Sequence, residues 1–156
     1  MNPIQMKNNL YNVSQIELTY KPKVKASERP VIKCMEDVYG IFMQCWDKGK
    51  IELIEEFKMI VLDKGSAVLG VINISSGGMD SVIVDHRIVV TAAILAKASG
   101  VILAHNHPSS RLFPSERDIA LTKTIKKAAA SLNVAVVDHL IVTESGYYSF
   151  ANKGLL

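Results

Sequence analysis

The sequence is poor in cysteine and in aromatic residues, and it has no long hydrophobic run. Only two cysteines, Cys34 and Cys45, occur among its 156 residues. They lie about three turns apart on a predicted helix, which is too far for a disulfide bond. Because free cysteine is among the most frequently buried residue types, we expect both thiols to be buried and structural.

Other missing features bear on location. No apolar stretch approaches the roughly 20 residues that a membrane-spanning helix needs, so we expect no membrane partner. The first residues, MNPIQMKNNLYNV, lack the apolar core of a secretory signal. Together with the free thiols, this indicates a cytoplasmic protein. Hydrophobic residues make up 49% of the chain, which argues against disorder and favours one domain with a substantial core.

Charge is unevenly distributed along the chain. Residues 1–33 contain six basic and two acidic residues and carry a net charge of +4, whereas the remainder carries −1. We therefore divide the chain into a basic N-terminal arm, residues 1–33, and a folded domain, residues 34–156. The arm can contact nucleic acid through phosphates, although a solvated arm is the favoured interpretation.

The arm also contains a short alternating pattern. Ile16, Leu18 and Tyr20 alternate with polar residues, which predicts an edge strand. Such a strand can extend the main sheet or the sheet of another subunit, so a homo-oligomer is one expectation.

The segment VILAHNHPSSRLFPSERD, residues 101–118, carries the pattern H-x-H-x7-S-x2-D. Its apolar start lies between Gly100 and Pro108, which predicts a short buried strand over residues 101–104. Residues two apart on an extended chain point to the same side, so we expect His105 and His107 to project together.

The second half of this segment predicts the start of a helix. Ser115 is a favourable N-cap residue, and Asp118 then falls in the first helical turn. If that turn folds over the strand end, its carboxylate lies beside two imidazoles. Two histidines and one carboxylate leave one position of a tetrahedral zinc ion open for water, which is typical of a catalytic site.

Each half of the pattern also has a purely structural interpretation. Ser115 and Asp118 can form only a capping box, and a single histidine beside an apolar strand is usually structural. The whole pattern, with two of the four histidines at one strand end, favours a metal site.

These residues resemble the JAB/MPN (JAMM) metalloprotease family, and in particular its RadC-like bacterial branch. The resemblance covers residues 51–156. It implies Zn²⁺ held by His105, His107 and Asp118, with Ser115 near the reaction centre. One departure is Ser110, where the branch has glycine, because serine adopts a glycine-like turn at a greater cost. The residues that carry the likeness are His105-Asn106-His107-Pro108-Ser109, Pro114-Ser115, Asp118 and Asp138-His139-Leu140-Ile141.

The same resemblance implies a glutamate at a strand start that serves as the general base. The pattern E-x-F before an apolar strand places this role on Glu55. Glu56 is one residue away and would face the opposite side of the strand. For either residue, the alternative is an exposed charge at a strand end.

Periodicity predicts an α/β fold, a mixed β-sheet flanked by helices. The resemblance implies the MPN/JAB fold, with a three-layer layout like that of cytidine deaminases. His139 interrupts an apolar strand, and we expect it to support the site or the core rather than to bind metal. His86 has no partner at ligand spacing and is predicted to lie at the surface or in a cap. The predicted elements are helices over residues 35–46, 88–99 and 116–132, a hairpin of residues 57–62 and 67–74, and strands over residues 101–104, 134–142 and 147–150.

The sequence therefore predicts a zinc-dependent hydrolase, either a metallopeptidase or an isopeptidase, that acts on a peptide or isopeptide substrate. A zinc deaminase is excluded because neither H-x-E nor P-C-x-x-C occurs. The remaining alternative is a non-catalytic binding module associated with DNA repair or mobile elements.

Overall fold

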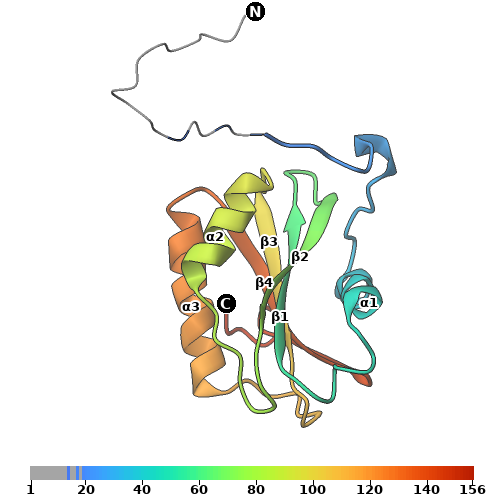
Figure 1. Cartoon of the computed structure of the whole chain (residues 1–156), viewed down its shortest axis with the longest axis vertical. Coiled ribbons are helices and arrows are strands. Elements are labelled where there is room, and N and C mark those ends of the chain that lie inside the picture. The colour runs from blue at the N-terminus through green and yellow to red at the C-terminus, as the bar shows by residue number, and fades with distance from the viewer. Residues whose placement is uncertain (1–13, 15–16, 18) are drawn as a thin grey trace, which may run out of the picture.

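The computed structural model describes residues 14, 17 and 19–156 (Figure 1). Three α-helices and five strands form the domain, and a short 3₁₀ helix precedes them. The elements are η1 (Ala26–Glu28), α1 (Met35–Cys45), β1 (Glu56–Leu62), β2 (Val68–Ser76), α2 (His86–Leu95), β3 (Gly100–Asn106), α3 (Glu116–Ala130), β4 (Ala135–Thr143) and β5 (Gly146–Ser149).

The five strands form one mixed sheet in the order β2-β1-β3-β4-β5. β1 pairs antiparallel with both β2 and β3, whereas β3 and β4 are parallel. The parallel pair is joined through α3, so the chain leaves β3 at its carboxyl end and enters this helix. In open α/β sheets, this is the end of a strand at which ligands usually bind.

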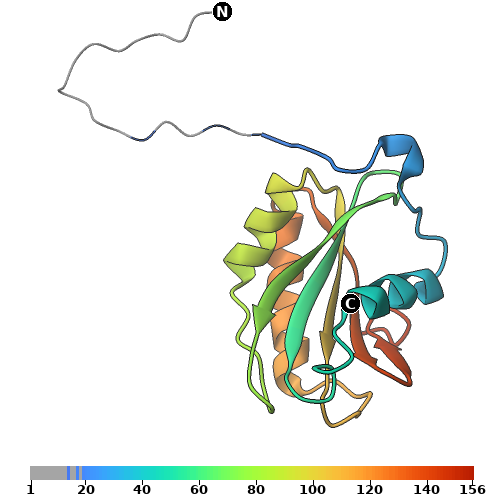
Figure 2. The ribbon, with the colours of Figure 1, turned by 45° about the vertical axis from the view of Figure 1, so that its right-hand side comes forward.

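The helices lie on both faces of the sheet, with α1 on one face and α2 and α3 on the other (Figure 2). Alternate residues of each central strand supply the two cores. Ile60 and Ile102 face α1, whereas Met59 and Leu103 face α2 and α3. The predicted α/β class, with a mixed sheet between helical layers, is confirmed.

Helix α2 differs from its predicted bounds. It was expected over residues 88–99, but it begins at His86 because the Asp85 side chain caps it by accepting from the Arg87 backbone N–H at 2.9 Å. It ends at Leu95, and Lys97 then takes a left-handed conformation with a φ of 60°. This conformation ends the helical path, so residues 96–99 lead into β3 instead.

The expectation of buried cysteines is wrong. Cys34 and Cys45 are both free and exposed. Cys34 is the N-cap of α1 and Cys45 is its last residue. The helix buries Val38 and Phe42 against the sheet, and its two end positions remain open to solvent.

The N-terminal expectations are only partly covered by the structure. Ile16 and Leu18 of the predicted edge strand lie outside the described residues, and the described Tyr20 is not in a strand. Residues 30–32 lie against the tip of the β1–β2 hairpin, where Val31 bridges Ala67. The division at residues 33 and 34 stays a prediction. Of the helices in the described part of the chain, none has the length and hydropathy that a bilayer crossing requires.

A buried asparagine ties the centre of the sheet to the segment before β1. Asn106 donates through Nδ2 to the carbonyls of Ile51 and Ile54 at 2.6 and 2.8 Å. Its Oδ1 accepts from the Glu56 backbone N–H at 2.7 Å, and its side chain is 0% exposed. This side chain therefore helps to position the segment that contains Glu55, whose own backbone also pairs with Gly77 and Gly78 at 2.8 and 2.9 Å.

We expect Asn106→Ala to lower the free energy of unfolding by about 2–3 kcal/mol, because it leaves buried backbone groups without hydrogen-bond partners. Urea denaturation followed by circular dichroism measures this change. Asn152→Ala, at an exposed position, is the control and should change stability by less than about 0.5 kcal/mol. Equal effects of the two substitutions would contradict the assigned role.

Candidate metal centre

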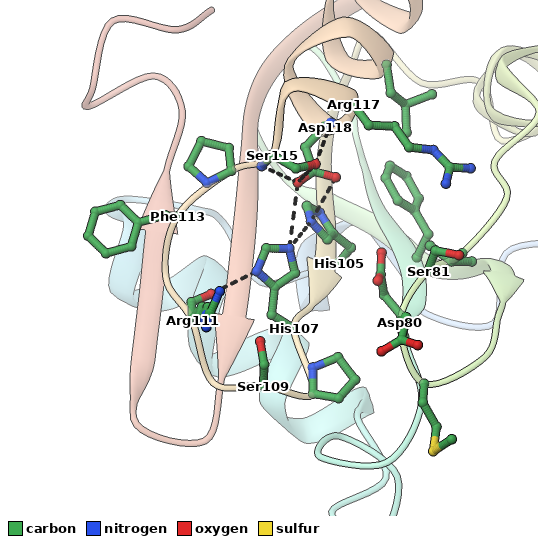
Figure 3. Close-up of a pocket in the computed structure, with 17 residues that line it drawn as sticks. Asp80, Ser81, His105, His107, Ser109, Arg111, Phe113, Ser115, Arg117 and Asp118 are labelled. Atoms are coloured by element: carbon green, nitrogen blue, oxygen red, sulfur yellow. Dashed lines mark hydrogen bonds and ion pairs between the residues drawn. The ribbon is translucent and has the colours of Figure 1, made fainter.

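Three side chains converge at the carboxyl end of β3 (Figure 3). His105 lies near the end of β3, His107 follows directly after the strand, and Asp118 lies in the first turn of α3. One ligand atom from each residue lies within 4.8 Å of the other two. The pattern H-x-H-x7-S-x2-D thus brings together the three residues predicted to bind metal.

The spacing of these atoms matches a tetrahedral metal site. His105 Nε2 lies 3.0 Å from His107 Nε2 and 3.4 Å from Asp118 Oδ1, and His107 Nε2 lies 3.6 Å from Asp118 Oδ2. Metal–ligand bonds of about 2.0–2.2 Å at tetrahedral angles place ligand atoms roughly 3.3 Å apart. The observed distances, which run to both carboxylate oxygens, are close to this value, so the three residues are suitably placed to hold a zinc ion.

The hydrogen bond of His107 to the Arg111 carbonyl leaves Nε2, the ring nitrogen that faces the cluster, without a hydrogen. Its Nδ1 lies 2.8 Å from the Arg111 carbonyl oxygen, which can only accept, so Nδ1 carries the hydrogen. In the neutral ring, Nε2 then carries no hydrogen, and its lone pair faces Asp118. Acceptor atoms that face one another in a partly buried site need a proton or a metal ion between them.

The same arrangement shifts two pKa values. Burial alone would raise the pKa of Asp118, but hydrogen bonds from His105 and His107, the charge of His105 and a hydrogen bond from Ser115 hold it far below its usual range. Burial alone would lower the pKa of His107, but the protonated ring can donate to the Asp118 carboxylate and to the Arg111 carbonyl, which raises the pKa above the ordinary value. The Asp118 carboxylate is therefore ionised, and a proton and a metal ion compete for His107 Nε2.

Ser115 and Asp118 also form the capping box that was the alternative interpretation of this spacing. Asp118 Oδ2 accepts from the Ser115 backbone N–H and from Ser115 Oγ, each at 2.7 Å. Ser115 Oγ accepts in turn from the Asp118 N–H at 3.2 Å. The cap and the metal cluster share one carboxylate, and the cap orients it.

Glu55 and Glu56 are adjacent in the chain, but their side chains lie in different surroundings. Glu55 is 9% exposed and lines the same cleft as His105 and His107. Burial raises its pKa, and the nearby histidines partly offset this rise. Glu56 accepts instead from Ser76 Oγ at 3.0 Å and lies 3.5 Å from Lys58 Nζ. The structure therefore places Glu55, and not Glu56, in the cleft.

The cleft around these residues has a volume of about 520 Å³. Met79 and Asp80 line it from the loop after β2, and Arg111 and Phe113 line it from the segment between β3 and α3. Met79 and Phe113 are 69% and 76% exposed. The opening therefore combines apolar side chains with charges of both signs, and sequence reasoning did not identify these lining residues.

His139 supports the cluster from beneath, as predicted. Its Nε2 lies 2.8 Å from His105 Nδ1, and its Nδ1 lies 2.6 Å from Thr122 Oγ1. Burial keeps the pKa of His139 well below the ordinary value, so the ring is neutral. Thr122 was not identified from the sequence, because nothing in its local pattern distinguishes it from a core residue.

Two other predictions have direct structural outcomes. Ser110 has a φ of 57°, so it adopts the left-handed conformation that glycine would take more cheaply. The loop therefore keeps this conformation with serine in that position. His86 begins α2 and does not belong to the metal cluster found among the described residues.

Known proteins match the part of the chain that contains His105, His107 and Asp118. The family model described as RadC-like JAB domain matches residues 32–155. A UPF0758 protein of Flavobacterium johnsoniae is 44% identical over 101 residues, which cover 65% of this chain and 44% of that protein. A UPF0758 protein of Thermotoga maritima is 42% identical over 116 residues, covering 74% and 52%. One of Desulforamulus reducens is 36% identical over 131 residues, covering 84% and 56%. The chain spans about half the length of these curated relatives.

We expect zinc binding to weaken as the pH falls, because each ligand must be free of protons. The raised pKa of His107 moves the start of this loss above the ordinary histidine value of about 6.5. Below it, the apparent affinity should fall by up to about tenfold per pH unit for each proton displaced. Chelator competition from about pH 8.5 to about pH 5.5 measures this dependence.

His107→Ala should weaken zinc binding at every pH, whereas His86→Ala should leave the wild-type profile unchanged. An affinity that does not change across this pH range would contradict the assignment of histidine ligands.

Proposed function

The chain belongs to the family of RadC-like JAB domains, and we propose that it is a zinc-dependent hydrolase that cleaves amide bonds as a peptidase or isopeptidase. One observation carries the proposal: three metal-ligating side chains share a cleft with a buried glutamate whose pKa is raised. His105, His107 and Asp118 would hold zinc, which when bound makes water a stronger acid and polarises a carbonyl group.

Glu55 supplies the proton transfers in this proposal. It accepts a proton from the attacking water and delivers it to the leaving nitrogen as the C–N bond breaks. A carboxyl group that performs both steps works best with a pKa near the working pH. Burial moves the pKa of Glu55 in this direction. Its position before β1 is held by its own backbone hydrogen bonds to Gly77 and Gly78 and by Asn106, which accepts from the Glu56 backbone N–H at 2.7 Å.

Ser115 has two roles to reconcile. Its hydroxyl donates to Asp118 at 2.7 Å and so holds the carboxylate in place. A second role in the proposed reaction, donation to the developing oxyanion of the substrate, requires that the same hydrogen turn toward the cleft. This second role stays a prediction.

The cleft supports a peptide substrate over a small polar molecule. Met79 and Phe113 offer exposed apolar surface at its opening, and Arg111 and Arg117 add positive charge. An extended chain with apolar and acidic side chains complements such a surface.

Glu55→Gln should reduce amide cleavage by about 100-fold or more and leave zinc content unchanged, because it removes the proton carrier but not a ligand. A peptide-library cleavage assay on the zinc-loaded protein, combined with metal analysis, measures both quantities.

Glu56→Gln is the matched control, since it changes the adjacent glutamate outside the cleft. It should retain near wild-type cleavage. Equal loss in the two variants, or full activity of Glu55→Gln, would rule out the assigned base.

A second candidate is a non-catalytic module that binds nucleic acid, for which the exposed Lys21, Lys23 and Lys25 are the supporting observation. If this function operates, DNA retention should weaken steeply with salt and should survive His107→Ala. Replacement of the three lysines by alanine should reduce the salt dependence. Filter binding at several salt concentrations tests both expectations, and loss of retention in His107→Ala would count against this candidate.

A further inference from the structure

We propose that Thr122 and His139 are positioning residues that hold His105 in the tautomer protonated on Nδ1, which leaves its Nε2 free for a metal ion. The inference rests on the proposed function, because it assigns the support of one ligand in the same site. It concerns a side-chain pair that does not contact the metal position.

A relay of buried hydrogen bonds, which runs from His105 through His139 and Thr122 to the Asp118 carbonyl, carries this inference. His105 Nδ1 lies 2.8 Å from His139 Nε2, and His139 Nδ1 lies 2.6 Å from Thr122 Oγ1. Thr122 Oγ1 also lies 2.6 Å from the Asp118 carbonyl oxygen. His105, His139 and Thr122 are 1%, 0% and 1% exposed, so water does not compete for these bonds. The chain of bonds begins and ends at two of the residues that converge on the metal position.

The carbonyl at one end sets the direction of every bond. A carbonyl oxygen only accepts, so the single Thr122 hydroxyl hydrogen points to Asp118. Thr122 Oγ1 then has only lone pairs to offer to His139. The neutral His139 must therefore carry its hydrogen on Nδ1.

The same logic continues to the metal position. A neutral imidazole with its hydrogen on Nδ1 has a bare Nε2, which accepts from His105. His105 consequently carries its hydrogen on Nδ1 and presents a bare Nε2 toward His107 and Asp118. This is the tautomer that a metal ion bound at Nε2 requires.

The opposite direction of these hydrogen bonds is unfavourable. If Thr122 donated to His139, two oxygen atoms would lie 2.6 Å apart with no hydrogen between them. His139 would then donate from Nε2, and His105 would hold its hydrogen on the nitrogen that faces the metal position. The Asp118 carbonyl therefore favours the tautomer that binds metal.

The decisive variant is Thr122→Val, which keeps the shape of the side chain and removes the hydroxyl. We expect zinc affinity to fall by about 10–100-fold, the usual effect of losing a partner behind a metal-binding histidine. Thr122→Ser keeps the hydroxyl and should restore the wild-type affinity. Chelator competition at constant pH gives the dissociation constants.

The matched control is Thr124→Val on the same helix. Thr124 Oγ1 donates to the carbonyl four residues earlier at 3.0 Å, as Thr122 does, but its side chain is exposed and contacts no histidine in the described structure. The control removes the same kind of bond without touching the relay, so zinc affinity should not change. Equal affinity of Thr122→Val and wild-type protein would overturn the proposal.

Nitrogen NMR of the histidine rings separates this inference from the proposed function. In zinc-free protein at about pH 8, we expect His139 to be protonated on Nδ1, with this state lost in Thr122→Val and kept in Thr122→Ser. Protonation of wild-type His139 on Nε2 would overturn the relay. Failure of wild-type protein to bind zinc would count against the proposed function, and the ring tautomers would still decide the inference.

Discussion

Mutual repulsion among three hydrogen-bond acceptors is the constraint on which the site depends. The two histidine nitrogens lie 3.0 Å apart, and the Asp118 carboxylate lies 3.4 Å from the nearer one. Their remaining hydrogen-bonding positions are occupied by Arg111, His139 and Ser115. Such a cluster is stable only with a proton or a metal ion at its centre. The donor set of two imidazoles and one carboxylate, at this spacing, is one that suits tetrahedral zinc.

Successive side chains of β3 point to opposite faces of the sheet, and this alternation determines which groups contact the metal cluster. His105 projects to the face of the sheet that α3 covers, where His139 of β4 contacts it and Thr122 of α3 contacts His139. Its neighbour Asn106 projects to the other face and holds the segment before β1. The same alternation on β1 separates Glu55, which lines the cleft, from Glu56, which pairs with Lys58. β3 thus positions the two histidines directly, at its carboxyl end, and helps to position Glu55 through Asn106 on the opposite face.

Helix α3 completes the site through its first two turns. Asp118 contributes a carboxylate to the cluster, a hydrogen-bond acceptor to the helix cap and a carbonyl to Thr122. The parallel connection from β3 to β4 places this helix over the strand end. The fold, the cap and the relay therefore converge on one residue. A change at Asp118 would disturb the metal cluster and the local helix start together, which makes its neighbours better probes of each role.

The sequence alone determined the features that depend on short-range periodicity. Strand alternation predicted that His105 and His107 share a side, and helix-start chemistry predicted the place of Asp118; both agree with the observed geometry. Exposure of the cysteines and the bounds of α2 were predicted wrongly, because they depend on contacts at helix ends. Only the tertiary structure revealed the partners of His105 and Asn106. His139 lies 34 residues from His105, and Ile51 lies 55 residues from Asn106. Sheet pairing and the α3 crossover bring such residues together, and local sequence patterns do not encode these long-range contacts.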